Sequence, residues 1–139
     1  MKKIKKTIIC LLSAMFLLVF LTPTCLAVEV NPIMPRWTGV GEVDTELTFY
    51  DAVGTATAVA TKRSSCTSLE GVMTIYEHID GEWILVDSTT KSTTRTSLGL
   101  TIEFDAESGV EYKAEFCITA YNGTTIIEEI TDTKYGTCP

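Results

Sequence analysis

The sequence contains a single histidine, His78, among 139 residues. One histidine cannot supply the several imidazole ligands of most zinc sites, and the five cysteines show no CxxC spacing. Neither a Gly-x-Ser-x-Gly motif nor an Asp-x-Asp-x-Asp-Gly calcium loop occurs. The sequence therefore predicts no catalytic residue, no metal site and no cofactor, and we expect a protein that is not an enzyme.

Positive charge is scarce after the first six residues. The chain has 11 Lys and Arg against 18 Asp and Glu, and four of the cations lie within residues 1–6. Binding to nucleic acid depends on clustered Lys and Arg side chains that neutralise phosphates. We therefore expect an acidic domain with no nucleic-acid partner.

Long apolar runs are confined to residues 8–21, which follow the basic start. A helix of this length would cover about 21 Å, which is short of the roughly 30 Å hydrocarbon core of a bilayer. The layout of residues 1–27 is typical of a secretory signal peptide of a bacterium, with cleavage after Ala27. Membrane contact through an uncleaved leader and a lipid-modified Cys25 remain open as alternatives.

Proline is absent between Arg36 and Cys138, and helical periodicity is absent over the same region. Threonine is abundant there, and Thr and Val favour strands because branching at Cβ restricts χ1. We expect an extended lead-in at 28–44, followed by an all-β domain at 45–139. The predicted strands are 45–51, 54–63, 70–79, 82–90, 97–104, 110–121 and 124–133.

Two dipeptides predict β-hairpins. Asp80-Gly81 and Asn122-Gly123 each lie between strand-like segments, and both tolerate the positive φ angles of two-residue hairpin turns. They connect the third predicted strand to the fourth, and the sixth to the seventh.

The segment 110–121 alternates between two sets of side chains. The first set is apolar or aromatic and is predicted to face the core: Val110, Tyr112, Ala114, Phe116, Ile118 and Ala120. A tight corner at 107–109 precedes Tyr112, which resembles the tyrosine corner of immunoglobulin-like sandwiches. The position that holds the core cysteine in antibody domains is Ala114 here, so we expect no such core disulfide.

Three cysteines follow the leader, namely Cys66, Cys117 and Cys138, so at most one internal bridge can form. Cys66 lies between the second and third predicted strands, at the same end as the Asn122-Gly123 turn. Cys117 is five residues before Asn122. We predict Cys66–Cys117 as the candidate disulfide, while pairing with Cys138 and the absence of a bridge stay open.

Aromatic side chains form the candidate binding surface. Tyr121 is predicted to face outward beside its turn, and Trp83 begins the strand after Asp80-Gly81, with Tyr76 near it across the hairpin. Packing within the domain is the alternative role for Tyr76, Trp83 and Tyr121.

Four short motifs resemble a family of small secreted proteins of Firmicutes that carry one immunoglobulin-like or fibronectin-like sandwich and have no assigned activity. The motifs, in order, are Pro35–Thr38, Gly54–Thr57, Asp80–Trp83 and Ser108–Tyr112. The resemblance implies a single antiparallel sandwich of about seven strands and an extracellular location. It transfers no catalytic residue.

The sequence thus favours a secreted, non-enzymatic binding module for a protein or a cell-envelope component. One alternative is an assembly subunit that pairs edge strands, for which the Ser- and Thr-rich segment Ser88–Ser97 is suited. Another is an inhibitor or immunity-like partner of a secreted enzyme. The oligomeric state does not follow from the sequence.

Overall fold

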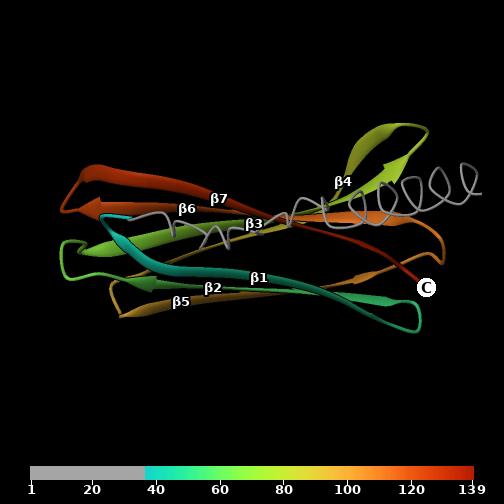
Figure 1. Ribbon diagram of the computed structural model, residues 1–139, viewed down its shortest axis with the longest axis horizontal. Coiled ribbons are helices and arrows are strands. Elements are labelled where there is room, and N and C mark those ends of the chain that lie inside the picture. The colour runs from blue at the N-terminus through green and yellow to red at the C-terminus, as the bar shows by residue number, and fades with distance from the viewer. Residues whose placement is uncertain (1–36) are drawn as a thin grey trace, which may run out of the picture. The chain divides into compact units, whose positions relative to one another are not determined.

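Seven strands make up most of the chain that the structure describes. The computed structural model describes residues 37–139, so the predicted signal peptide at 1–27 and residues 28–36 of the lead-in lie outside the described residues. The strands are β1 (Val40–Tyr50), β2 (Val53–Lys62), β3 (Ser68–Ile79), β4 (Glu82–Thr93), β5 (Ser97–Asp105), β6 (Glu111–Asn122) and β7 (Thr125–Thr137) (Figure 1). The predicted all-β fold of seven strands is confirmed, although β1 begins five residues earlier than expected, inside the range predicted as lead-in.

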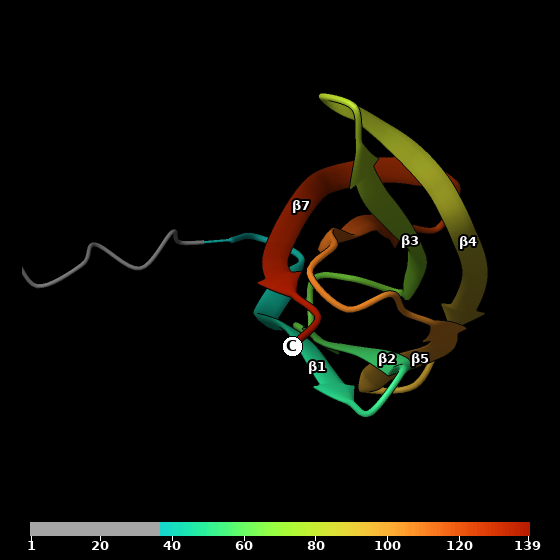
Figure 2. The ribbon, with the colours of Figure 1, turned by 90° about the vertical axis from the view of Figure 1, so that its right-hand side faces the viewer.

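The strands form two antiparallel sheets that face each other (Figure 2). One sheet has three strands in the order β1-β2-β5, and the other has four in the order β4-β3-β6-β7. The turns gather at two ends. The β3–β4 end holds the turn at 80–81 and Cys138, and the β6–β7 end holds the turn at 123–124 and residues 37–39.

The core lies between the sheets and follows the alternation along each strand. On β6 every second side chain from Tyr112 to Ala120 is at most 1% exposed, whereas the side chains between them are partly exposed. On β2 the small side chains Ala56, Ala58 and Ala60 are buried across from them. A slip of one residue would turn the buried set toward water, so burial fixes the register. The predicted inward set is confirmed from Tyr112 onward, and Val110 is partly buried just before β6.

The two predicted hairpins are present, but their turns differ. Asp80 and Gly81 have φ angles of 52° and 86°, as a two-residue turn with two left-handed residues requires. Asn122 is still paired with Thr125, so the second turn consists of residues 123–124 and has its positive φ at Gly123. The predicted turn is therefore displaced by one residue.

Tyr112 joins the corner before β6 to the core. Its ring is 1% exposed and packs against the rings of Phe49 and Phe104, at centroid distances of 5.6 Å and 5.1 Å. The Tyr112 hydroxyl accepts a hydrogen bond from the Glu107 backbone N–H at 2.9 Å. This contact is the one expected of a tyrosine at such a corner.

Glu128 on β7 holds the start of β1. Its carboxylate accepts hydrogen bonds from the backbone N–H groups of Thr38, Gly39 and Val40, at 2.8 to 3.0 Å. Because β1 and β7 belong to different sheets, these bonds connect the sheets along one side.

Candidate functional site

The outer face of the four-stranded sheet carries aromatic side chains near the β3–β4 end. Side chains on β3 alternate between the core and the outer face, and Ile75 is buried in the core. Tyr76 and His78 therefore lie on the outer face. His78 pairs with Trp83 on β4, and Lys113 on β6 lies between Tyr76 and Tyr135 in register. We call Tyr76, His78, Trp83, Lys113 and Tyr135 the aromatic cluster.

The aromatic cluster spans all four strands of its sheet. The Trp83 ring stacks on the His78 imidazole, with centroids 4.7 Å apart and an interplanar angle of 25°. The same ring lies 5.8 Å from the Tyr135 ring. Since β4 and β7 form opposite edges of the sheet, Trp83 reaches Tyr135 across the strands between them.

Lys113 supplies a positive charge beneath the rings. Its Nζ lies 4.2 Å from the Tyr76 ring centroid and 5.3 Å from that of Trp83, within the range of cation–π attraction. It also lies 3.4 Å from Glu115, while His78 Nδ1 lies 3.4 Å from Glu111. The Lys113 side chain is 15% exposed, so its charge interacts mainly with Glu115 and with the two rings.

Two rings of this cluster and one apolar side chain beside it are open to solvent. Tyr135 is 58% exposed, Leu85 is 60% exposed and Trp83 is 36% exposed. A surface of this kind, with aromatic rings next to carboxylates, can bind by stacking and hydrogen bonding without covalent chemistry.

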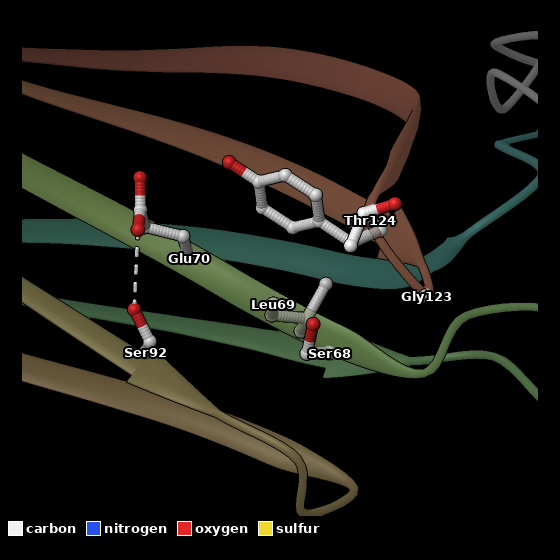
Figure 3. Close-up of a pocket in the computed structure, with 7 residues that line it drawn as sticks. Ser68, Leu69, Glu70, Ser92, Gly123 and Thr124 are labelled. Atoms are coloured by element: carbon white, nitrogen blue, oxygen red, sulfur yellow. Dashed lines mark hydrogen bonds between the residues drawn. The ribbon is translucent and has the colours of Figure 1, made fainter.

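Tyr121 lies apart from the aromatic cluster. It is eight residues from Lys113 along β6, or about 26 Å at the rise of a strand. There it lines an open depression at the β6–β7 end, together with Ser68, Glu70, Ser92 and Thr124. Figure 3 shows the Ser92 hydroxyl donating to the Glu70 carboxylate across this depression, at 3.2 Å. Of the three predicted surface residues, the structure thus brings together Tyr76 and Trp83.

Sequence reasoning missed Tyr135 and Lys113. The predicted seventh strand ends at residue 133, and although the predicted hairpin pairs it with the sixth strand, a register shift at Ala120 and Tyr121 sets which residues are opposite. The hairpin prediction alone therefore did not place Tyr135 opposite Lys113. The outward position of Lys113 was predictable, because it lies between Tyr112 and Ala114 in the alternating segment.

The predicted Cys66–Cys117 disulfide is wrong, since both cysteines are free in the structure. Cys117 pairs with Val72, six residues beyond Cys66, which separates the two by about 20 Å along β3. They also differ in environment, because Cys66 is buried and Cys117 lies on the outer face, 3.4 Å from the Thr131 hydroxyl.

Cys138 is also free, and it is buried rather than exposed as a passive surface thiol would be. It lies at the β3–β4 end, with its Sγ 3.7 Å from the carbonyl of Asp51.

The described residues contain no group of three His, Cys, Asp or Glu side chains that could hold a metal ion. Among residues 37–139 there is also no helix with the length and hydrophobicity of a membrane span.

Comparison with known proteins finds no matching family model and no matching curated protein. Solved structures show weak similarity. A putative beta-galactosidase from Bacteroides fragilis is 13% identical with a TM-score of 0.46, over 66% of this chain and 15% of its own. Wild-type OgpA from Akkermansia muciniphila is 11% identical with a TM-score of 0.40, over 73% and 30%. Spo0M, a sporulation control protein from Bacillus subtilis, is 12% identical with a TM-score of 0.38, over 73% and 49%. The chain spans less than two thirds of each of these proteins, and similarity at this level assigns no function to it.

Proposed function

We propose that the protein is an exported, non-enzymatic binding module that contacts a protein or cell-envelope partner through the aromatic cluster. The observation that carries this proposal is the solvent exposure of Tyr135, Trp83 and neighbouring Leu85 on one sheet face. Large apolar side chains that gather on a surface mark interaction sites more often than chance. Export is supported by the signal-peptide pattern of residues 1–27.

The proposal includes an immunoglobulin-like fold. If the strands are lettered A, B, C, C′, E, F and G, the sheets read A-B-E and C′-C-F-G. The fourth strand then lies beside the third, on the sheet that holds the last two strands, as C′ does in variable-type domains. The hydrogen bond between Tyr112 and Glu107 further supports this fold.

A binding role is also supported by how His78 is used. Its imidazole contacts the Glu111 carboxylate and the Trp83 ring, and among residues 37–139 no hydrogen bond joins it to a serine hydroxyl. A Ser–His–Asp hydrolase needs a histidine within hydrogen-bond distance of a serine hydroxyl. His78 therefore acts as a structural part of the aromatic cluster.

Fluorescence of Trp83 tests the proposal directly. The chain has two tryptophans, so a Trp37→Phe background leaves Trp83 as the sole reporter. Purified protein is titrated with isolated cell walls and with secreted proteins of a Gram-positive bacterium. We expect a shift of Trp83 emission and lower quenching by acrylamide, because the partner covers the ring.

Two variants make this test specific. Tyr135→Ser is expected to remove the response, whereas Tyr50→Ser, at the 82% exposed tyrosine of β1, leaves it unchanged. Trp83 emission that no fraction alters would overturn the proposal. Turnover of a substrate that is lost in His78→Ala would also overturn it.

A further inference from the structure

The hairpin formed by β3 and β4 exposes apolar side chains on both of its faces. Trp83 and Leu85 lie on the outer face and are 36% and 60% exposed. Ile79 and Ile84 lie at positions that would face a core, yet they are 38% and 44% exposed. Figure 1 shows the end of the hairpin extending away from the three-stranded sheet. Apolar exposure on both faces favours an interaction surface over simple packing.

β4 also presents an unpaired backbone edge. It is the terminal strand of its sheet, and within the described residues no strand pairs with its free side along Glu82–Leu85. A register shift opposite Ile75 and Tyr76 interrupts the pairing of β4 just after Leu85. The regular stretch before the shift therefore offers N–H and C=O groups to an added strand.

The hairpin is strongly acidic. Between residues 76 and 87 there are four carboxylates, on Glu77, Asp80, Glu82 and Asp87, and no Lys or Arg. Lys113, which contacts the Tyr76 and Trp83 rings of the hairpin, also forms an ion pair with Glu115. This uncompensated charge attracts a positively charged partner and repels an acidic one.

Together these observations identify one class of partner. We infer that an extended, cationic segment of a partner protein adds to the free edge of β4. Its backbone pairs with Glu82–Leu85, and its apolar side chains contact Trp83 and Leu85 on the outer face. Its Lys or Arg side chains lie on the other face, with their apolar stems against Ile84 and their charges near Glu82 and Asp87. The way Lys113 sits against the Tyr76 and Trp83 rings shows that this surface accommodates a cation. This inference rests on the proposed function and names the partner class for that site.

A peptide titration of the full chain tests the inference. The probe is a short, capped peptide that alternates lysine and valine, and the readout is NMR shift and hydrogen exchange of backbone amides. We expect saturable binding, slower exchange of amides within Glu82–Leu85 and weaker binding as salt rises. A matched peptide with glutamate for lysine is expected not to bind.

A third peptide distinguishes backbone pairing from charge attraction. It has the sequence of the lysine peptide, but alternate backbone nitrogens are methylated. Strand addition predicts that its affinity falls at least about tenfold, because the added strand loses its donors. Leu85→Thr and Glu82→Gln are each expected to weaken the unmethylated peptide about fivefold. Val59→Thr and Glu103→Gln, on the outer face of the other sheet, serve as controls and leave affinity unchanged.

The outcomes distinguish this inference from the proposed function. Equal affinity for the methylated peptide overturns strand addition and leaves diffuse charge attraction. Binding of cell walls at Trp83 without binding of the peptide overturns the inference while the proposed function stands. If amide exchange in β4 slows as the protein concentration rises, with no peptide present, then a second copy of the chain pairs with this edge. That result also overturns the inference. If neither the peptide nor any envelope fraction affects Trp83, both fail.

Discussion

At the residue scale, Glu128 shows how one carboxylate can connect the two sheets. Partial burial acts to raise the pKa of Glu128, but hydrogen bonds from the N–H groups of Thr38, Gly39 and Val40 and the charge of Arg63 outweigh it. The pKa is therefore held below its ordinary value of 4.5. A lowered pKa means that the folded protein favours the ionised form, so ionisation of Glu128 stabilises the fold.

This stabilisation depends on pH in a defined direction. It is fully present above pH 4.5 and is lost as the pH falls through the lower pKa of the folded state. Glu128→Gln is expected to lower the free energy of unfolding by about 1–2 kcal/mol at neutral pH, because an amide oxygen replaces a charged acceptor. Urea denaturation measures this loss, which shrinks in acid.

Glu129→Gln is the matched control for Glu128, because Glu129 is an exposed neighbour that accepts none of the three bonds. A loss in Glu128→Gln that stays constant from neutral pH to well below pH 4.5 would contradict the assignment.

The cysteines differ in accessibility, which makes a second prediction at this scale. Maleimide is expected to label Cys117 in the native protein, because that thiol lies partly exposed on a sheet face. Cys66 and Cys138 are 3% and 1% exposed and are expected to react after unfolding in urea. Mass spectrometry of the labelled peptides separates the three sites. A Cys66 that resists labelling in urea but reacts after reduction would contradict the free thiol.

At the element scale, alternation is the feature that made the strands predictable. The pattern of 110–121 and the Asp80-Gly81 turn are local, so they follow from sequence spacing and the φ angles that a turn needs. Which strands become neighbours is not local. The contact of Trp83 with Tyr135 depends on the order β4-β3-β6-β7 and on side chains that reach across two strands, which no local pattern specifies. The same limitation explains the incorrect disulfide.

Glycine in β2 makes room for an aromatic ring, which gives a prediction at this scale. Gly54 pairs with Phe104 on β5, and a Cβ at position 54 would overlap the Phe104 ring. Gly54→Ala is therefore expected to destabilise the fold by about 1–3 kcal/mol, measured by urea denaturation. Gly99→Ala is the control, because no atom lies within 4 Å of its added Cβ, and its change is expected to stay within about 0.5 kcal/mol. Equal stability of the two variants would argue against the Gly54–Phe104 packing.

At the scale of the whole molecule, carboxylates outnumber cations and gather on one sheet face. Residues 37–139 contain 17 carboxylate side chains and six Lys or Arg side chains. Three of these cations, Lys62, Arg63 and Lys91, donate hydrogen bonds to backbone carbonyls of the same chain. The outer face of the three-stranded sheet carries five carboxylates at outward strand positions that hold no Lys or Arg, namely Glu42, Asp44, Glu46, Glu103 and Asp105.

Repulsion among these carboxylates predicts that salt stabilises the protein. Sodium chloride up to about 0.2 M shortens the Debye length below 10 Å and screens like charges. We expect the thermal midpoint to rise by a few degrees over this range in calorimetry at neutral pH. Glu103→Lys is expected to reduce that rise, because it places a cation among the carboxylates of this face. A midpoint that falls with salt would show that attractive pairs dominate.

The course of the chain has a mechanical consequence. Trp37 lies at the β6–β7 end and Cys138 at the β3–β4 end, so a pull between them acts along the strands. The hydrogen bonds of β1 with β2 and of β6 with β7 run perpendicular to that direction. They would be loaded together in shear instead of being opened one after another, and the bonds of Glu128 to β1 would resist the first displacement. A pull between these two ends is therefore expected to need a higher force than one that opens a single strand pair bond by bond.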